Sequence, residues 1–91
     1  MSSVSETLKI THSSGLHARA STEFVRLAQR FSAEVSVSRI GGSTVDGKST
    51  IAVMTLGAQL GDDIMIETTG PDAEDALAAL TELVRLDFHG V

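Results

Sequence analysis

The clearest pattern along the chain is an apolar stripe at helical spacing after residue 17. Its members recur at steps of three and four residues, which predicts a helix over about residues 18–31 with one buried face. Charged residues recur at the same spacing on another face, which we expect to be exposed. The buried stripe comprises Ala20, Phe24, Leu27, Ala28 and Phe31, and the charged row comprises Arg19, Glu23, Arg26 and Arg30.

A second long helix is predicted after Gly70-Pro71-Asp72. Proline is favoured at the first helical position and acidic residues in the first turn, so we expect Pro71 to open this helix. The pattern weakens near 87–91, where we expect the chain to fray. The buried stripe of this helix consists of Ala73, Ala76, Leu77, Leu80, Leu83 and Val84.

Alternating apolar and polar residues predict the strands between these helices. The expected strands cover residues 5–11, 33–39, 43–46 and 63–69. Residues 49–56 fit either a strand or a short helix, which Ser49 would cap well. The element order is therefore β-α-β-β-(α)-β-α. Helices that each have one apolar face pack most economically on one face of an antiparallel sheet, so the pattern predicts a two-layer α+β domain.

Composition narrows the class of protein. The chain has 91 residues, with 42% hydrophobic and 21% charged residues, which fits one globular domain over residues 1–91. It contains no cysteine, so a disulfide framework and a thiolate metal site are excluded. The N-terminus has no basic and apolar leader, and no apolar run is long enough to cross a membrane. We therefore expect a cytoplasmic protein without membrane insertion.

The charge is acidic overall and unevenly distributed. A formal net charge of −5 argues against a general nucleic-acid binder. Residues 1–48 hold six Lys or Arg and four acids, whereas residues 49–91 hold one Arg and eight acids. The first half, which also carries His17, is therefore mildly basic. Uneven surface charge is common in small proteins, so charge alone does not decide for a binding site.

The sequence Gly15-Leu16-His17-Ala18-Arg19 lies where the first predicted helix begins. The first N–H groups of a helix have no partner within the helix, and its dipole places partial positive charge there, so this end suits a phosphate. Arg19 adds a planar set of charged donors. Gly15 would let the backbone approach closely. A solvated turn is the simpler alternative.

The chemistry of His17 follows from that position. A helix N-terminus and a neighbouring arginine both disfavour the charged ring, so we expect a neutral imidazole, which is a nucleophile. The ring could then accept a phosphoryl group. His12 could approach His17, but two histidines do not make a metal site, and His89 lies in the expected frayed end. We predict no metal and no cofactor.

Beyond spacing, the chain resembles HPr, the histidine-containing phosphocarrier family of the bacterial phosphoenolpyruvate–sugar phosphotransferase system. The resemblance covers nearly the whole chain. It rests on the segment around His17, on Lys48-Ser49-Thr-Ile-Ala-Val-Met-Thr-Leu-Gly57-Ala58, and on Gly70-Pro71-Asp72-Ala-Glu-Asp-Ala-Leu. It implies an open-faced β-sandwich with a four-stranded antiparallel sheet and the order β-α-β-β-α-β-α.

The resemblance also implies roles for particular residues. The phosphorylated histidine of the family corresponds to His17, modified on Nδ1, and the phosphate-binding arginine corresponds to Arg19. Enzyme I would load His17 from phosphoenolpyruvate, and a protein of the enzyme IIA type would unload it. The regulatory serine corresponds to Ser49, which an HPr kinase/phosphorylase would modify where one is present. Ser49 as a helix cap alone is the competing interpretation.

Two positions depart from the common family pattern. Ala20 stands where proline is usual, and Ser21 where alanine is usual. Alanine is a good helix former, so the helix should still form. These features, with the longer loop around Gly41-Gly42, are similar to α-proteobacterial and nitrogen-related members, which often work in regulatory phosphorelays. The sequence leaves the sugar and nitrogen pathways open.

We expect partners to dock around His17, the outer face of the first helix and the Ser49 segment, and we expect a monomer. Transient encounters of this kind bury little surface. The opposed hypothesis is a regulatory binding module that never carries phosphate. The residues predicted to contact partners are Ala20, Ser21, Phe24, Arg26, Lys48, Ile51, Met54 and Leu56, with a core position as the alternative for Phe24.

Overall fold

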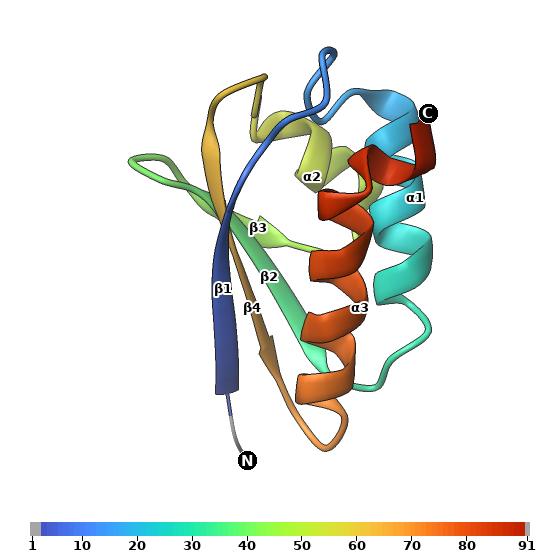
Figure 1. The fold of residues 1–91 in the computed structure, drawn as a ribbon. Coiled ribbons are helices and arrows are strands. Elements are labelled where there is room, and N and C mark those ends of the chain that lie inside the picture. The colour runs from blue at the N-terminus through green and yellow to red at the C-terminus, as the bar shows by residue number, and fades with distance from the viewer. Residues whose placement is uncertain (1–2, 91) are drawn as a thin grey trace.

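A computed structural model describes residues 3–90 and shows one sheet with helices on one of its faces (Figure 1). The sheet has four strands in the order β1-β4-β2-β3, and every neighbouring pair is antiparallel. The α+β class and the open-faced sandwich predicted from the sequence are confirmed. The strands are β1 (Ser3–Lys9), β2 (Glu34–Arg39), β3 (Thr44–Asp46) and β4 (Asp63–Thr69).

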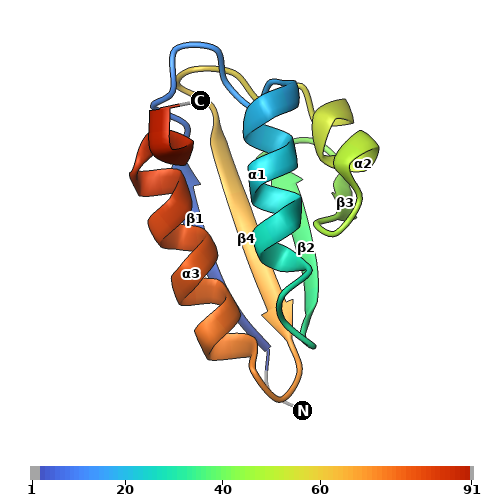
Figure 2. The ribbon, with the colours of Figure 1, turned by 90° about the vertical axis from the view of Figure 1, so that its right-hand side faces the viewer.

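The helices form the second layer. Figure 2 shows α1 and α3 over the sheet, with α2 beside them near β3, and packing between α1 and both other helices joins this layer together. The helices are α1 (Ala18–Ala28), α2 (Thr50–Thr55) and α3 (Ala73–Arg85), followed by a short C-terminal turn, η1 (Asp87–Gly90). Within residues 3–90, none of these helices has the length and apolar character needed to cross a membrane.

Along β4, every second side chain points into the core. Ile64, Ile66 and Thr68 are buried, while Glu67 on the opposite face is exposed. The buried Thr68 hydroxyl donates a hydrogen bond to the Ala73 carbonyl at 2.6 Å. The strand thus presents an apolar face to the helices and supplies a polar contact where α3 begins.

The ambiguous segment 49–56 is helical. It forms α2, and Ser49 occupies the N-cap, where its hydroxyl accepts the Ala52 N–H at 3.3 Å. Val53 is fully buried on the inner side of this helix. The helical alternative of the sequence interpretation is therefore confirmed.

Several predicted boundaries are wrong. The first helix ends at Ala28 rather than near residue 31, because Arg30 and Phe31 donate hydrogen bonds three residues back in a tightened last turn. The first strand covers Ser3–Lys9 rather than 5–11, because its pairing with β4 ends at Lys9 opposite Asp63.

The start of the last helix also differs from prediction. Pro71 is not its first residue, because α3 begins at Ala73. The Asp72 carboxylate does not cap α3 but accepts the N–H groups of Ser32 and Ala33 at 2.9 and 2.7 Å. Asp72 thereby ties the start of α3 to the connection between α1 and β2.

The predicted fraying near the C-terminus is wrong for residues 87–90. They form η1, and Phe88 is 1% exposed in the core. Asp87, Phe88 and His89 all have left-handed φ values, of 52°, 56° and 58°. Burial of the Phe88 ring offsets part of the cost of this conformation. Val91 lies outside the described residues.

Candidate functional site

His17 is the N-cap residue of α1, as the sequence predicted. Its backbone is extended, with φ −75° and ψ −179°, and its Nδ1 accepts the backbone N–H of Arg19 at 3.1 Å. Because Nδ1 is the acceptor, the neutral ring carries its hydrogen on Nε2. The ring is half-buried. The nitrogen with the lone pair therefore faces the N-terminal end of the helix.

A close backbone contact places the loop that leads to His17. The Leu16 N–H donates to the Ala58 carbonyl at 2.9 Å, so this loop lies against the segment after α2. Gly15 has φ +66°, and a Cβ at this position would lie 2.5 Å from the Ala58 oxygen. Only glycine fits both the backbone conformation and the contact. The close approach inferred from the sequence is thus between two backbone segments.

His12 is folded back against His17. A hydrogen bond from the Gly15 N–H to the His12 carbonyl, at 2.9 Å, closes the turn between them. The two ring centroids are 5.0 Å apart with an interplanar angle of 55°. The expected approach of His12 to His17 is confirmed. Among residues 3–90, no group of three or more His, Cys, Asp or Glu side chains is placed to hold a metal ion.

The C-terminal turn η1 is a part of this region that the sequence pattern did not reveal. The Phe88 ring lies edge-on to the His12 ring, with centroids 6.2 Å apart. The Thr11 hydroxyl donates a hydrogen bond to Asp87. The only sequence signal was a single apolar Phe88 after Leu86 and Asp87, and one residue is too short for a periodic pattern.

Arg19 lies exposed in the first turn of α1. Arg19 lines a shallow hollow together with other residues of the first two turns of α1 and Gly90 of η1. Arg26, one of the predicted contact residues, is also exposed on α1 and lies 3.8 Å from Glu23 at its nearest charged atoms. The exposed face of α1 therefore carries both signs of charge, with arginine at each end.

Ser49 lies half-buried at the start of α2, next to two exposed apolar side chains. Ile51 is 77% exposed and Met54 is 43% exposed. The Lys48 ammonium donates a hydrogen bond to the Phe31 carbonyl at 2.6 Å, which links the start of α2 to the end of the α1 region. Ile51 and Met54 are three residues apart in α2, so these two exposed apolar side chains are neighbours on the helix surface.

Four residues predicted to contact partners are buried instead. Ala20 and Phe24 belong to the apolar stripe of α1, Ser21 follows Ala20, and Leu56 directly follows α2. All four are at most 6% exposed, so a partner cannot reach them. Ser21 illustrates the reason, since its hydroxyl is buried and donates to the Leu16 carbonyl at 3.2 Å. The corrected residues are Ala20, Ser21, Phe24 and Leu56.

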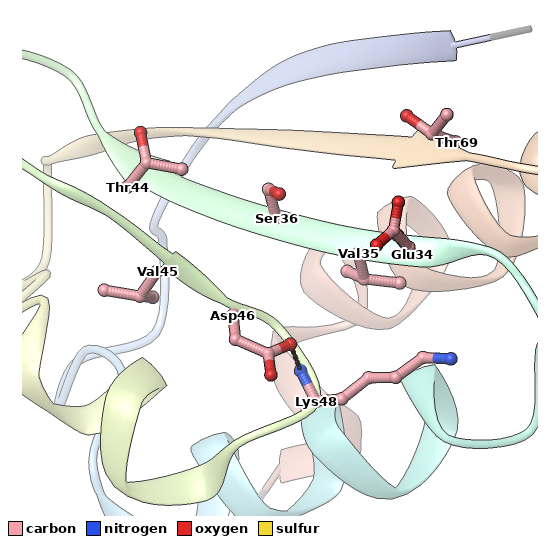
Figure 3. A pocket seen from close by; sticks show the side chains of 8 residues that line it. All are labelled: Glu34, Val35, Ser36, Thr44, Val45, Asp46, Lys48 and Thr69. Carbon is pink, nitrogen blue, oxygen red and sulfur yellow. Dashed lines mark hydrogen bonds between the residues drawn. The ribbon is translucent and has the colours of Figure 1, made fainter.

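A second hollow lies at the edge formed by β2 and β3 (Figure 3). It is lined by strand residues that include Glu34 and Asp46, and by Lys48, whose backbone N–H donates to the Asp46 carboxylate at 2.9 Å. His17, Arg19 and Ser49 do not line it. This hollow is therefore separate from the histidine site.

Comparison with known proteins gives a consistent result. A family model described as the PTS HPr component phosphorylation site matches residues 4–85. Phosphocarrier protein HPr of Pseudomonas aeruginosa is 43% identical over 81 residues, covering 89% of this chain and 90% of that protein. Phosphocarrier protein NPr of Escherichia coli is 38% identical over 85 residues, covering 93% and 94%.

A comparison of structures gives the same family. The crystal structure of a phosphocarrier protein HPr from Bacillus anthracis superposes with a TM-score of 0.86 and 37% identity, covering 92% of this chain and 99% of that one. The layers described above are thus those of a solved structure of similar sequence.

Proposed function

The chain belongs to the HPr family of phosphocarrier proteins, and we propose that it carries its phosphoryl group on Nδ1 of His17. The observation that carries this assignment is the position of that nitrogen. Nδ1 has the lone pair of the neutral ring and faces the first turn of α1, where it accepts the Arg19 N–H. A nucleophile in this position lies beside the backbone N–H groups at the start of α1. These groups can donate hydrogen bonds to the phosphoryl group that the nucleophile accepts.

The transfer step needs no further group from this chain. The Arg19 N–H first releases the Nδ1 lone pair, which attacks phosphorus and forms a new N–P bond. The bond between phosphorus and the donor, phospho-enzyme I, breaks, and its electron pair returns to the donor. Nε2 keeps its proton, and the Arg19 N–H now donates to a phosphoryl oxygen. The Arg19 guanidinium, exposed in the same turn, supplies further charged donors. An acceptor of the enzyme IIA type reverses these steps.

Docking in this proposal uses the exposed parts of α1 and α2. Ile51 and Met54 supply apolar area beside Ser49, and Arg26 supplies positive charge. A thioether such as Met54 adapts to differently shaped partners, which suits a carrier that meets a donor and an acceptor in turn. Encounters of this kind are brief and bury little surface. We place the carrier in the cytoplasm, acting as a monomer.

Phosphorylation of Ser49 by an HPr kinase/phosphorylase is the regulatory part of the proposal. A phosphoserine would add a charge of about −2 beside the exposed Ile51. This charge would repel acidic partners and hydrate an apolar contact, so transfer to and from His17 would slow. Incubation with ATP and the kinase should give acid-stable phosphate that Ser49→Ala removes and Thr50→Ala retains. Absence of that product in the wild type would contradict this part alone.

The phosphocarrier assignment is tested by incubation with enzyme I and phosphoenolpyruvate. The expected product is an acid-labile mass gain of one phosphoryl group, which His17→Ala abolishes. His89→Ala is the matched control, because His89 is exposed on η1, and it should be labelled like the wild type. Labelling that survives in His17→Ala would show that another residue is the acceptor. Absence of labelling in the wild type would favour a binding module that never carries phosphate.

A further inference from the structure

The histidine pair at the start of α1 extends the proposed function. His12 and His17 come from a short turn, and their half-buried rings lie with centroids 5.0 Å apart. The transfer step described above uses His17 and Arg19 but gives His12 no role. A polar ring held this close to a nucleophile is also close to whatever group that nucleophile carries.

The orientation of the His12 ring is fixed by its neighbours. Its Nδ1 accepts the backbone N–H of Ser14 at 3.1 Å. The neutral ring therefore carries its hydrogen on Nε2, which is a donor. The edge-on contact with Phe88, and the hydrogen bond between Thr11 and Asp87, hold this part of the loop against η1. The His12 ring is thus held by contacts on its Nδ1 side and with Phe88.

A phosphoryl group on His17 would change what surrounds this donor. It brings about −1.5 to −2 charge and three strong acceptor oxygens to a ring whose centroid lies 5.0 Å from that of His12. Resting on the proposed function of His17, we propose that His12 is a second side-chain ligand of the phosphoryl group, with its Nε2–H donating to a phosphoryl oxygen. Arg19 then acts from the helix that follows His17, and His12 from the turn that precedes it.

This role requires no covalent step at His12. The N–P bond stays on His17, and the Nε2–H of His12 is a hydrogen-bond donor whose proton stays on the ring. A hydrogen bond to a charged group contributes more to stability than one between neutral groups. His12 therefore makes phospho-His17 more favourable and raises the share of phosphoryl groups held by this carrier at equilibrium.

Two substitutions test the roles of the two ring nitrogens of His12 separately. In His12→Asn, the amide oxygen lies near the position of Nδ1 and keeps an acceptor for the Ser14 N–H, but the donor at Nε2 is lost. In His12→Gln, the longer amide places an N–H near the position of Nε2. His89→Asn, on exposed η1, is the control for the loss of an imidazole elsewhere. Thermal unfolding of each variant, which should match the wild type, separates lost folding from a lost ligand.

The test is a competition for phosphoryl groups. Equimolar wild type and variant are mixed with catalytic enzyme I and limiting phosphoenolpyruvate, and the phosphorylated fraction of each is read from its mass at equilibrium. We expect the wild type to be favoured over His12→Asn by about 3- to 10-fold, the range for one hydrogen bond of ordinary net strength. His12→Gln should return the ratio towards one, and His89→Asn should leave it at one. The phosphorus NMR shift of phospho-His17 should also differ between the wild type and His12→Asn.

The outcomes are distinguishable. If the wild type takes no phosphoryl group, the proposed function of His17 is wrong. If it does, but shares the group equally with His12→Asn, then His12 is not a ligand and the inference is overturned. If His12→Gln loses as much as His12→Asn, the ring acts through packing and not through its Nε2–H, which also overturns the inference.

Discussion

The nucleophile proposed for this chain is one ring nitrogen, and the loop before it determines where that nitrogen lies. The sequence predicted His17 at the helix start because glycine, histidine and arginine stand where an apolar stripe begins. The direction of Nδ1 towards the Arg19 N–H was not predictable from residue order. It depends on the extended backbone of the N-cap, which the Leu16–Ala58 hydrogen bond helps to hold.

Gly15 gives a residue-scale prediction. Gly15→Ala should lower the free energy of unfolding by about 2–5 kcal/mol, because the new Cβ is strained at φ +66° and would lie 2.5 Å from the Ala58 oxygen. Gly57→Ala is the control. Gly57 has φ +65° but no atom within 4 Å of its Cβ position, so it should lose only about 1–2 kcal/mol. Urea unfolding measures both, and equal losses would show that the close contact contributes nothing.

At the scale of elements, α3 shows why the exact first residue of a helix cannot be predicted from the sequence alone. The Gly70-Pro71-Asp72 segment correctly predicted a helix after it. The Asp72 carboxylate, however, accepts hydrogen bonds from the N–H groups of Ser32 and Ala33, which are far away in the chain. Because those partners are tertiary, no local pattern contains them. The same limit explains η1, where Phe88 reaches the core through a left-handed turn that no periodicity describes.

Asp72 gives the element-scale prediction. The hydrogen bond from the Ser32 N–H, with that from Ala33, holds the pKa of Asp72 below its ordinary value, against an opposing effect of desolvation. A lowered folded-state pKa means that the stabilisation is complete above about pH 4, the unfolded value, and is lost as the pH falls through the folded value. Asp72→Asn should therefore be less stable than the wild type at neutral pH, and the difference should shrink in acid.

Urea unfolding at several pH values between neutral and strongly acidic measures this effect. Asp75→Asn is the matched control, since Asp75 is an exposed carboxylate in the first turn of the same helix. Its difference from the wild type should be smaller at neutral pH. A difference for Asp72→Asn that stays constant with pH would contradict the assigned role of the ionised carboxylate.

For the whole molecule, the alternation of strands and the two apolar stripes were enough to predict a two-layer α+β domain. The strand order β1-β4-β2-β3 does not follow from that pattern, because alternation fixes which face of a strand is buried but leaves its neighbour in the sheet open. The partner surface was predicted only in part. Residues on the helical stripes were assigned to contacts with partners, although the same periodicity marks them as core.

The exposed apolar side chains of α2 give the prediction at this scale. Ile51→Glu should slow phosphoryl transfer from enzyme I by about tenfold, the cost of truncating one moderate contact residue, by placing a charge in the docking surface. Its unfolding free energy should change by less than about 0.5 kcal/mol, because Ile51 is 77% exposed. Ile40→Glu, at a position 57% exposed after β2, is the control and should transfer at the wild-type rate. Equal rates of phosphoryl transfer for both variants would show that Ile51 is not part of the docking surface.

The most direct test of the central claim is to locate the phosphoryl group on the ring atom itself. The protein is labelled with nitrogen-15 in its histidine rings, phosphorylated with enzyme I and phosphoenolpyruvate, and examined by NMR for coupling between phosphorus and a ring nitrogen. We expect one coupled nitrogen, Nδ1 of His17, with the hydrogen bond to the Arg19 N–H lost from that atom. Coupling to Nε2 of His17, or to a nitrogen of His12 or His89, would contradict the proposed role of Nδ1.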